Sequence, residues 1–321
     1  MEHVVSVIIP SHKRDLATVR RAVESVINQT YKNIEIVVVD DSPADFEDRN
    51  AIADYVESID FEGTAVYIRN KNPLGGSLAR NVGIEACKGD YVTFLDDDDE
   101  YYPKKIENQL SFMLENDCDL SFSDMIIYNT AGKVVDYRDH PGIADYSNET
   151  LLKYHLTKNL SGTPTFMFRT KKLREIGGFP DAKMGQDFYM MLRAIESGLV
   201  IRYCKTCDIK VYKHSNGGIS QGKNKIIGEN SLFEFKKKYF GRLSKSEVRF
   251  VKFRHYAVMV VAYLRNRNPL FALGMGIMAF WASPADFFRE VFGFFSRIIA
   301  HKDEKYPEPE TEIEIPETVN R

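Results

Sequence analysis

The sequence predicts an α/β fold built on a doubly wound, mostly parallel sheet. Two apolar, largely β-branched runs at residues 4–9 and 34–39 predict buried strands. Apolar residues recur at helical spacing between them, which predicts a helix covering one face of the sheet. These residues are Leu16, Val19, Val23, Val26 and Ile27. The result is a βαβ unit, and continued alternation of strands and helices favours a parallel sheet.

The alternation continues further along the chain. We expect a strand at 65–68, a turn at 72–76, a helix at 77–86 and a strand at 91–95. These elements extend the first βαβ unit into one large sheet.

The next region is less regular but still strand-rich. A turn at 131–133 joins two predicted short strands, and a further strand is expected at 165–168. A helix should follow Gly185, and a strand at 200–211 should lead to His214.

The chain after the sheet becomes helical. We expect a catalytic domain at 1–220, a basic helical extension at 221–268, a membrane-associating segment at 269–300 and a disordered acidic tail at 301–321.

The segment 269–300 has two apolar parts. Residues 270–282 carry no charge, but spanning a bilayer takes about 20 such residues. Residues 287–299 place eight apolar side chains on one helical face, as an interfacial helix does. A helix packed on the catalytic core or on a second subunit is the alternative, and a re-entrant hairpin of both parts is a third reading.

Composition narrows the function. The 321 residues have 43 Lys and Arg against 46 Asp and Glu, so no overall positive field favours nucleic acid. Four scattered cysteines do not form the disulfide framework of a secreted protein, and the lone pair Cys204 and Cys207 is too little for zinc. The first apolar run is too short for a signal peptide. We therefore expect a cytoplasmic location, peripheral on the inner face of the cell membrane.

Two acidic clusters follow predicted strands. Asp40 and Asp41 end one strand, and Asp96, Asp97, Asp98 and Asp99 end another. In parallel sheets, functional groups gather at the carboxyl ends of strands. Four adjacent carboxylates repel one another unless they are solvated or bound to a cation, and their oxygens suit Mg²⁺ or Mn²⁺. The pattern predicts a metal site at this edge of the sheet.

Several segments together resemble glycosyltransferase family 2, whose members share the GT-A fold. The matching segments are 5–10 (VSVIIP), 25–31 (SVINQTY), 35–42 (EIVVVDDS), 79–84 (ARNVGI) and 89–99 (GDYVTFLDDDD). A second match lies near 177–193. No single segment is specific, but their order and spacing are.

The resemblance implies a donor site. Asp41, with Asp40 beside it, matches the aspartate that accepts a hydrogen bond from uracil, and a carboxylate suits an imide N–H because it only accepts. A role of Asp41 as a turn or cap residue is the alternative. The family's Asp-x-Asp motif matches Asp96, Asp97 and Asp98. Asp98 should bind the metal, and Asp96 should bind ribose or the metal shell. Asp99 could share this role.

Further residues complete the expected site. The resemblance places the general base at Asp187, after Gln186 where the family usually has Glu; capping of the following helix is the alternative. It places His214 near the metal and diphosphate. The end of the first strand, Pro10 and Ser11, should lie at the nucleotide.

Two basic residues are candidates for the diphosphate. Arg80 and Lys13 could hold the phosphates or the nucleotide, and both could equally be surface residues.

The expected function is metal-dependent inverting transfer of a sugar from a nucleotide donor, with UDP as the expected nucleotide, to a hydroxyl of a glycan or lipid-linked saccharide. Cell-surface polysaccharide synthesis is the expected setting, and the enzyme could be a homo-oligomer. A non-catalytic membrane-associated nucleotide-sugar-binding protein is one alternative. A nucleotidyltransferase is another, although residues 10–14 lack the glycine-rich loop expected of it.

Overall fold

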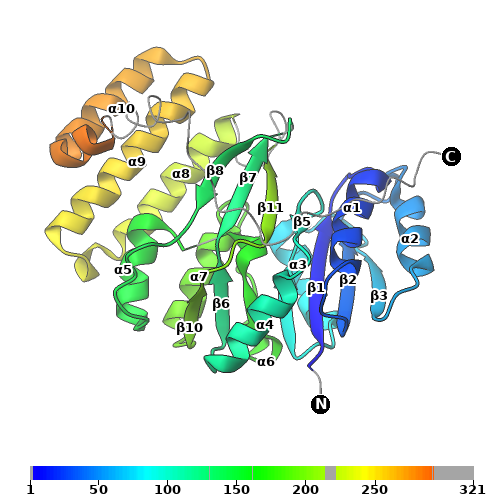
Figure 1. Ribbon diagram of the computed structural model, residues 1–321. Coiled ribbons are helices and arrows are strands. Elements are labelled where there is room, and N and C mark those ends of the chain that lie inside the picture. Colours follow the sequence, from blue (N-terminus) through cyan, green and yellow to red (C-terminus); the bar gives the residue numbers. More distant parts are fainter. Residues whose placement is uncertain (1–2, 130, 161, 214–221, 291, 293–321) are drawn as a thin grey trace. The chain divides into compact units, whose positions relative to one another are not determined.

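The computed structural model describes residues 3–129, 131–160, 162–213, 222–290 and 292. They divide into two compact units (Figure 1). The first contains residues 3–142 and 160–213, and the second contains residues 143–159 and the helices that follow residue 221. The predicted domain boundaries stay predictions.

The first unit is built on a seven-stranded sheet with the order β10-β6-β9-β4-β1-β2-β3. Its strands are β1 (Val5–Ser11), β2 (Ile34–Asp40), β3 (Thr64–Arg69), β4 (Tyr91–Phe94), β6 (Leu120–Ser123), β9 (Met167–Arg169) and β10 (Ile201–Cys204). The pairs β1–β2, β1–β4, β2–β3 and β6–β10 are parallel. Only β9 runs against its neighbours β4 and β6. The predicted mostly parallel sheet is confirmed.

Helices cover both faces of this sheet. Alternate residues of β1, among them Val7 and Ile9, share an apolar core with the buried faces of three helices. These helices are α1 (Leu16–Ile27), α2 (Arg49–Ser58) and α4 (Lys105–Glu115). On the other face, Ile8 of β1 lies against Gly83 of α3 (Gly76–Ala86). The helices α6 (Thr170–Glu175) and α7 (Gln186–Glu196) complete the unit. The chain is therefore doubly wound, as predicted.

A smaller sheet with the order β5-β11-β7-β8 lies in the same unit (Figure 1). Its strands are β5 (Glu100–Tyr101), β7 (Met125–Asn129), β8 (Val134–Arg138) and β11 (Ile209–Lys213). The predicted turn joins β7 to β8, where the Asn129 side chain accepts from the amides of Ala131 and Lys133.

The structure corrects the strand predicted at 200–211. The segment forms two strands, β10 in the large sheet and β11 in the small one, because the chain leaves one sheet at Cys204 and enters the other at Ile209. The strand predicted at 165–168 begins later, after the short 3₁₀ helix η1 (Thr163–Thr165).

The second unit is helical in its described part. It contains α5 (Asn148–Lys158), α8 (Gly222–Lys237), the 3₁₀ helix η2 (Phe240–Arg242), α9 (Lys245–Arg265) and α10 (Pro269–Ala282). A capping box of Ser244 and Glu247 begins α9. The predicted C-terminal helical extension is thus present. Most of the amphipathic face predicted at 287–299 lies outside the described residues.

Candidate active site

The Asp41 carboxylate lies at the carboxyl end of β2 and is 3% exposed. It accepts hydrogen bonds from the Asn70 side chain and from the backbone amides of Leu74 and Gly75, each at 2.7 Å. Gly75 has φ = 90°, which favours glycine because a Cβ is strained there. Asp41 therefore fixes the turn that begins α3, as the alternative role of a turn or cap residue predicts.

Its neighbour Asp40 is engaged elsewhere. The Asp40 carboxylate pairs with Arg49 at 2.5 Å and accepts from the Tyr67 hydroxyl at 2.7 Å. Asp40 and Arg49 are both buried, so this pair holds α2 against β2 and β3. The Asp40 carboxylate therefore stabilises the fold through its bonds to Arg49 and Tyr67.

The acidic loop after β4 alternates in exposure. The side chains of Asp96 and Asp98 are 38% and 17% exposed, whereas Asp97 and Asp99 are buried. The amide of Asp99 donates to the carbonyl of Asp96, so the loop turns back on itself. A tight turn in which every second carboxylate reaches solvent presents Asp96 and Asp98 as the accessible pair.

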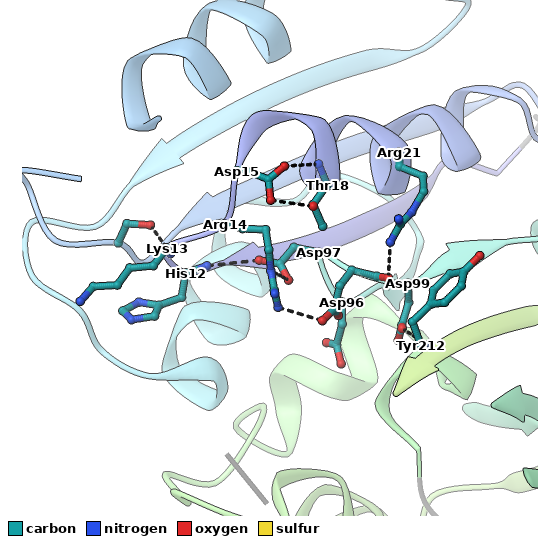
Figure 2. A network of polar contacts seen from close by, with 12 residues as sticks. His12, Lys13, Arg14, Asp15, Thr18, Arg21, Asp96, Asp97, Asp99 and Tyr212 are labelled. Atoms are coloured by element: carbon teal, nitrogen blue, oxygen red, sulfur yellow. Dashed lines mark hydrogen bonds and ion pairs between the residues drawn. The ribbon is translucent and has the colours of Figure 1, made fainter. Parts of the chain in front are cut away.

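Two arginines near the start of α1 face this loop (Figure 2). Arg14 lies 3.1 Å from the Asp97 carboxylate and 2.8 Å from that of Asp98. Arg21 donates to the Asp98 carbonyl at 2.8 Å and pairs with Glu100. Arg14 precedes the N-cap Asp15 and Arg21 lies within α1, so no helical spacing relates them, and neither residue was predicted from the sequence.

Burial destabilises the charged forms of the Asp97 and Asp99 carboxylates. Burial raises the pKa of Asp97 to about 6; Arg14 opposes this rise, while Asp98 and Asp96 add to it. Burial and the charges of Asp96 and Asp98 also raise the pKa of Asp99, although its carboxylate accepts from the Tyr212 amide at 2.9 Å. The loop thus holds more negative charge than its nearby cations neutralise.

Arg80 joins this loop to the helix that carries Asp187. The guanidinium is buried; one Nη donates to the Asp96 carboxylate and the other donates to Gln186 Oε1 at 2.6 Å. Arg80 is therefore not a surface residue. The position where the family usually has Glu is occupied by Gln186, whose neutral amide oxygen can still accept this bond.

Asp187 stands at the second position of α7. The helix is capped by Gly185 at φ = 72°, with no side-chain cap, so Asp187 is not the N-cap residue. Its carboxylate is half-buried and accepts from the amide of Phe188 at 2.9 Å. Asp187 therefore lies in the first turn of α7.

The segment 177–179 is anchored from two sides. The Asn81 side chain of α3 pairs with both the amide and the carbonyl of Phe179, at 2.7 and 2.8 Å. Arg193 of α7 donates to the carbonyls of Gly177 and Gly178. Asn81 and Arg193 therefore hold the backbone of residues 177–179 in place.

The remaining predicted residues lie at the end of β1 or outside the described chain. Pro10 pairs with Val39 in the sheet register, and the Ser11 carbonyl accepts from the Asp41 amide at 2.7 Å. Lys13 is exposed, and its amide donates to the Ser42 hydroxyl. His214 lies outside the described residues.

The described side chains at this edge that could bind a metal ion are few. Within the described ranges, no group of three or more His, Cys, Asp or Glu side chains is arranged to hold an ion. Asp96 and Asp98 remain as accessible hard oxygen donors, and Mg²⁺ is commonly bound by one or two carboxylates together with substrate phosphates. The residues present fit a cation of that kind.

The fold and this edge define a GT-A glycosyltransferase. Residues 6–177 match the model of Glycosyl transferase family 2. The match covers more than half of the chain, and the chain belongs to this family.

Individual relatives agree. The chain is 31% identical over 222 residues to TuaG of Bacillus subtilis, a putative teichuronic acid biosynthesis glycosyltransferase, with 68% of this chain and 82% of TuaG covered. It is 26% identical over 194 residues to an uncharacterised glycosyltransferase of Methanocaldococcus jannaschii, covering 60% of this chain and 64% of the relative. The chain spans only 21% of a Rickettsia felis glycosyltransferase that it matches.

The fold also resembles solved structures. The crystal structure of an S. aureus TarS fragment in complex with UDP-GlcNAc superposes with a TM-score of 0.56 at 17% identity, covering 86% of this chain and 91% of the fragment. At this identity the likeness concerns the fold.

Proposed function

We propose that this glycosyltransferase moves a sugar from a UDP donor to a hydroxyl of a glycan or lipid-linked saccharide, with inversion and with Mn²⁺ or Mg²⁺ as cofactor. The putative role of TuaG in teichuronic acid biosynthesis supports a role in cell-surface polysaccharide synthesis. The nucleotide sugar bound by TarS supports a UDP donor and an N-acetylhexosaminyl or hexosyl group.

One observation carries the proposal. Arg80 bonds to Asp96 of the acidic loop and to Gln186, the residue before Asp187. Arg80 therefore links the Asp-x-Asp motif to the residue that precedes the proposed base, at the carboxyl edge of the sheet where such folds bind ligands.

The chain's own residues have the following roles in this proposal. Asp96 and Asp98 would hold the cation, with His214 as a further candidate ligand; a bound cation supplies Lewis-acid stabilisation of the departing diphosphate. Arg14 lies beside the acidic loop, and Lys13 follows the end of β1. Both can compensate phosphate charge. Asp41 fixes the turn before α3 and, with one acceptor site left on its carboxylate, can accept from a uracil imide.

Asp187 would take the proton of the acceptor hydroxyl as that oxygen attacks the anomeric carbon. The bond to the diphosphate breaks as the new glycosidic bond forms, and the proton moves to the Asp187 carboxylate. This single displacement inverts the anomeric centre.

Calorimetric titration of UDP with and without Mn²⁺ tests the donor site. Wild type should bind UDP more tightly with Mn²⁺, and Asp98→Ala should lose that metal dependence, because its carboxylate is one of the accessible pair. Asp54→Ala, an exposed acid of α2, is the matched control and should bind as wild type does. Absence of UDP binding by folded wild type under both conditions would overturn the donor assignment.

Asp187→Asn separates catalysis from binding. We expect a loss in kcat of about 10²- to 10⁴-fold, typical for removal of a general base. UDP binding should be unchanged. Full turnover by the variant would exclude Asp187 as the base. UDP binding by wild type without turnover of any UDP-sugar would favour the non-catalytic alternative.

A further inference from the structure

The helix α10 exposes its large side chains. Leu270 is 80% exposed, Leu273 65%, Ile277 52% and Trp281 74%. Their spacing of three, four and four residues places them on one face of the helix. Phe288, just beyond α10, is 50% exposed. A soluble helix normally turns such residues inward.

The opposite face of α10 is made of small residues. Ala272 and Ala279 are buried, and a Cβ on Gly276 would contact Val260 of α9 at 4.0 Å. Tyr263 of α9 also packs against Phe271, with ring centroids 5.4 Å apart. The helix thus rests on α9 through these small side chains and Phe271, while Leu270, Leu273, Ile277 and Trp281 stay exposed.

The same unit is strongly basic. Residues 222–290 contain 13 Lys and Arg and 5 Asp and Glu, an excess of 8 positive charges in a chain whose net charge is −3. Arg265 and Arg267, directly before α10, are exposed, as is Arg289 beyond it. Positive charge therefore precedes the apolar face at the N-terminal end of α10, whereas Arg289 beyond the other end is paired with Asp286 at 2.5 Å.

The dimensions favour lying on a surface over crossing it. The 14 residues of α10 extend about 21 Å, whereas a bilayer core is about 30 Å thick. In the described part of the chain, no single helix is long and apolar enough to cross a membrane. The helices Pro269–Ala282 and Pro284–Glu290 together have the length and composition of a span, but the chain bends by 118° between them.

We propose that the exposed face of α10, with Phe288 and the arginines Arg265 and Arg267, binds the surface of an anionic lipid bilayer. The apolar side chains would enter the boundary between headgroups and acyl chains, while the arginines pair with lipid phosphates. The inference is independent of the donor and of catalysis.

Trp281 offers a direct test because it is the one tryptophan of the sequence. On mixing the full chain with vesicles of equal parts phosphatidylglycerol and phosphatidylcholine, its emission should shift to the blue and be quenched by lipids brominated on the acyl chain. Vesicles of phosphatidylcholine alone should produce a much weaker effect. An unchanged emission with anionic vesicles would overturn the proposal.

Vesicle flotation of variants separates the contribution of the apolar side chains to lipid binding from that of the arginines. Leu273→Ser with Ile277→Ser should weaken binding more than tenfold, since each apolar side chain loses its burial. Leu114→Ser, at a leucine of α4 that is 45% exposed, is the control. Arg265→Gln with Arg267→Gln should weaken binding roughly fivefold per removed charge. The charge-matched control is Lys133→Gln with Lys171→Gln, both exposed in the other unit.

A second copy of the chain is the competing occupant. Sedimentation in the absence of lipid distinguishes it: a dimer that Leu273→Ser with Ile277→Ser converts to monomer, without vesicle binding by wild type, would overturn the proposal. Equal binding to neutral and anionic vesicles would also overturn it.

Discussion

Lys105, at the start of α4, is a charged group that the proposed reaction does not use. It is 1% exposed; its ammonium donates to the Thr93 hydroxyl and lies 4.2 Å from the ring centroid of Tyr101. Burial lowers the pKa of Lys105 to about 7, and Asp208 acts in the opposite direction. Burial of the charged ammonium therefore opposes folding at Lys105.

The sign of the pH dependence follows. Between about pH 7 and the ordinary lysine pKa of 10.5, the unfolded chain binds more protons at Lys105 than the folded chain, so this residue's contribution makes stability rise with pH. Lys105→Met removes that contribution. The free energy of unfolding of the variant minus that of wild type should therefore fall, by on the order of a few kcal/mol at most, from pH 7 to pH 10.

Urea denaturation at several pH values measures this difference, in which the titration of other groups largely cancels. Lys171→Met, at an exposed lysine, should give a difference that does not change with pH. A constant difference for Lys105→Met would mean that the buried amine titrates normally.

At the same scale, sequence reasoning located carboxylates better than their partners. The acidic run stands after a buried strand, and this position alone indicated a site. The ion pairs of Arg14, Arg80 and Arg49 join residues distant in the chain, and no local pattern encodes them. Arg80 could have been a surface residue by spacing; only the fold shows that it connects two loops.

The element that depends most on one small residue is α3. A Cβ on Gly83 would lie 2.6 Å from Ile8 Cγ2 of β1, closer than real contacts allow. Alanine favours a helix by roughly 1 kcal/mol over glycine, but the clash in the core costs about 1–3 kcal/mol. We expect Gly83→Ala to be destabilising, because the helix must move away from the sheet.

A double-mutant cycle checks this explanation. In an Ile8→Ala background the space for the new methyl exists, so Gly83→Ala should cost less than in wild type, as measured by urea denaturation. Equal costs in both backgrounds would show that the Ile8 contact is not the cause.

Helices and strands of the βαβ region could be predicted because their periodicity is strong. The helices α2 and α4 escaped prediction, as their apolar faces are short and interrupted by charge. The break between β10 and β11 also escaped, because a continuous β-rich segment does not encode the change of sheet; tertiary pairing decides it.

For the whole molecule, ligand binding should be visible as stability. If UDP with Mn²⁺ binds only the folded chain, a concentration of one hundred times its Kd should raise the free energy of unfolding by about 2.7 kcal/mol. Thermal or urea unfolding with UDP, with and without EDTA, measures this gain. EDTA and Asp98→Ala should each remove most of it; a gain that survives both would contradict metal-dependent binding.

The architecture as a whole was accessible from the sequence because the family's segments occur in a fixed order. What was not accessible is the grouping of residues 143–159 with the C-terminal helices. This association depends on contacts between segments far apart in the chain, such as the ion pair of Arg242 with Glu149.

The position of β9 has a consequence for biosynthesis. β9 lies between β4 and β6 in the sheet but follows both in the chain, and the other neighbour of β6, β10, comes later still. While the ribosome makes residues 124–166, β6 has no sheet neighbour and β4 has one open edge. Unpaired edges invite pairing with other chains. Emergence of residues 167–169 from the ribosome therefore allows β6 to join the sheet through β9, and the remaining edge of β6 stays open until β10 is made.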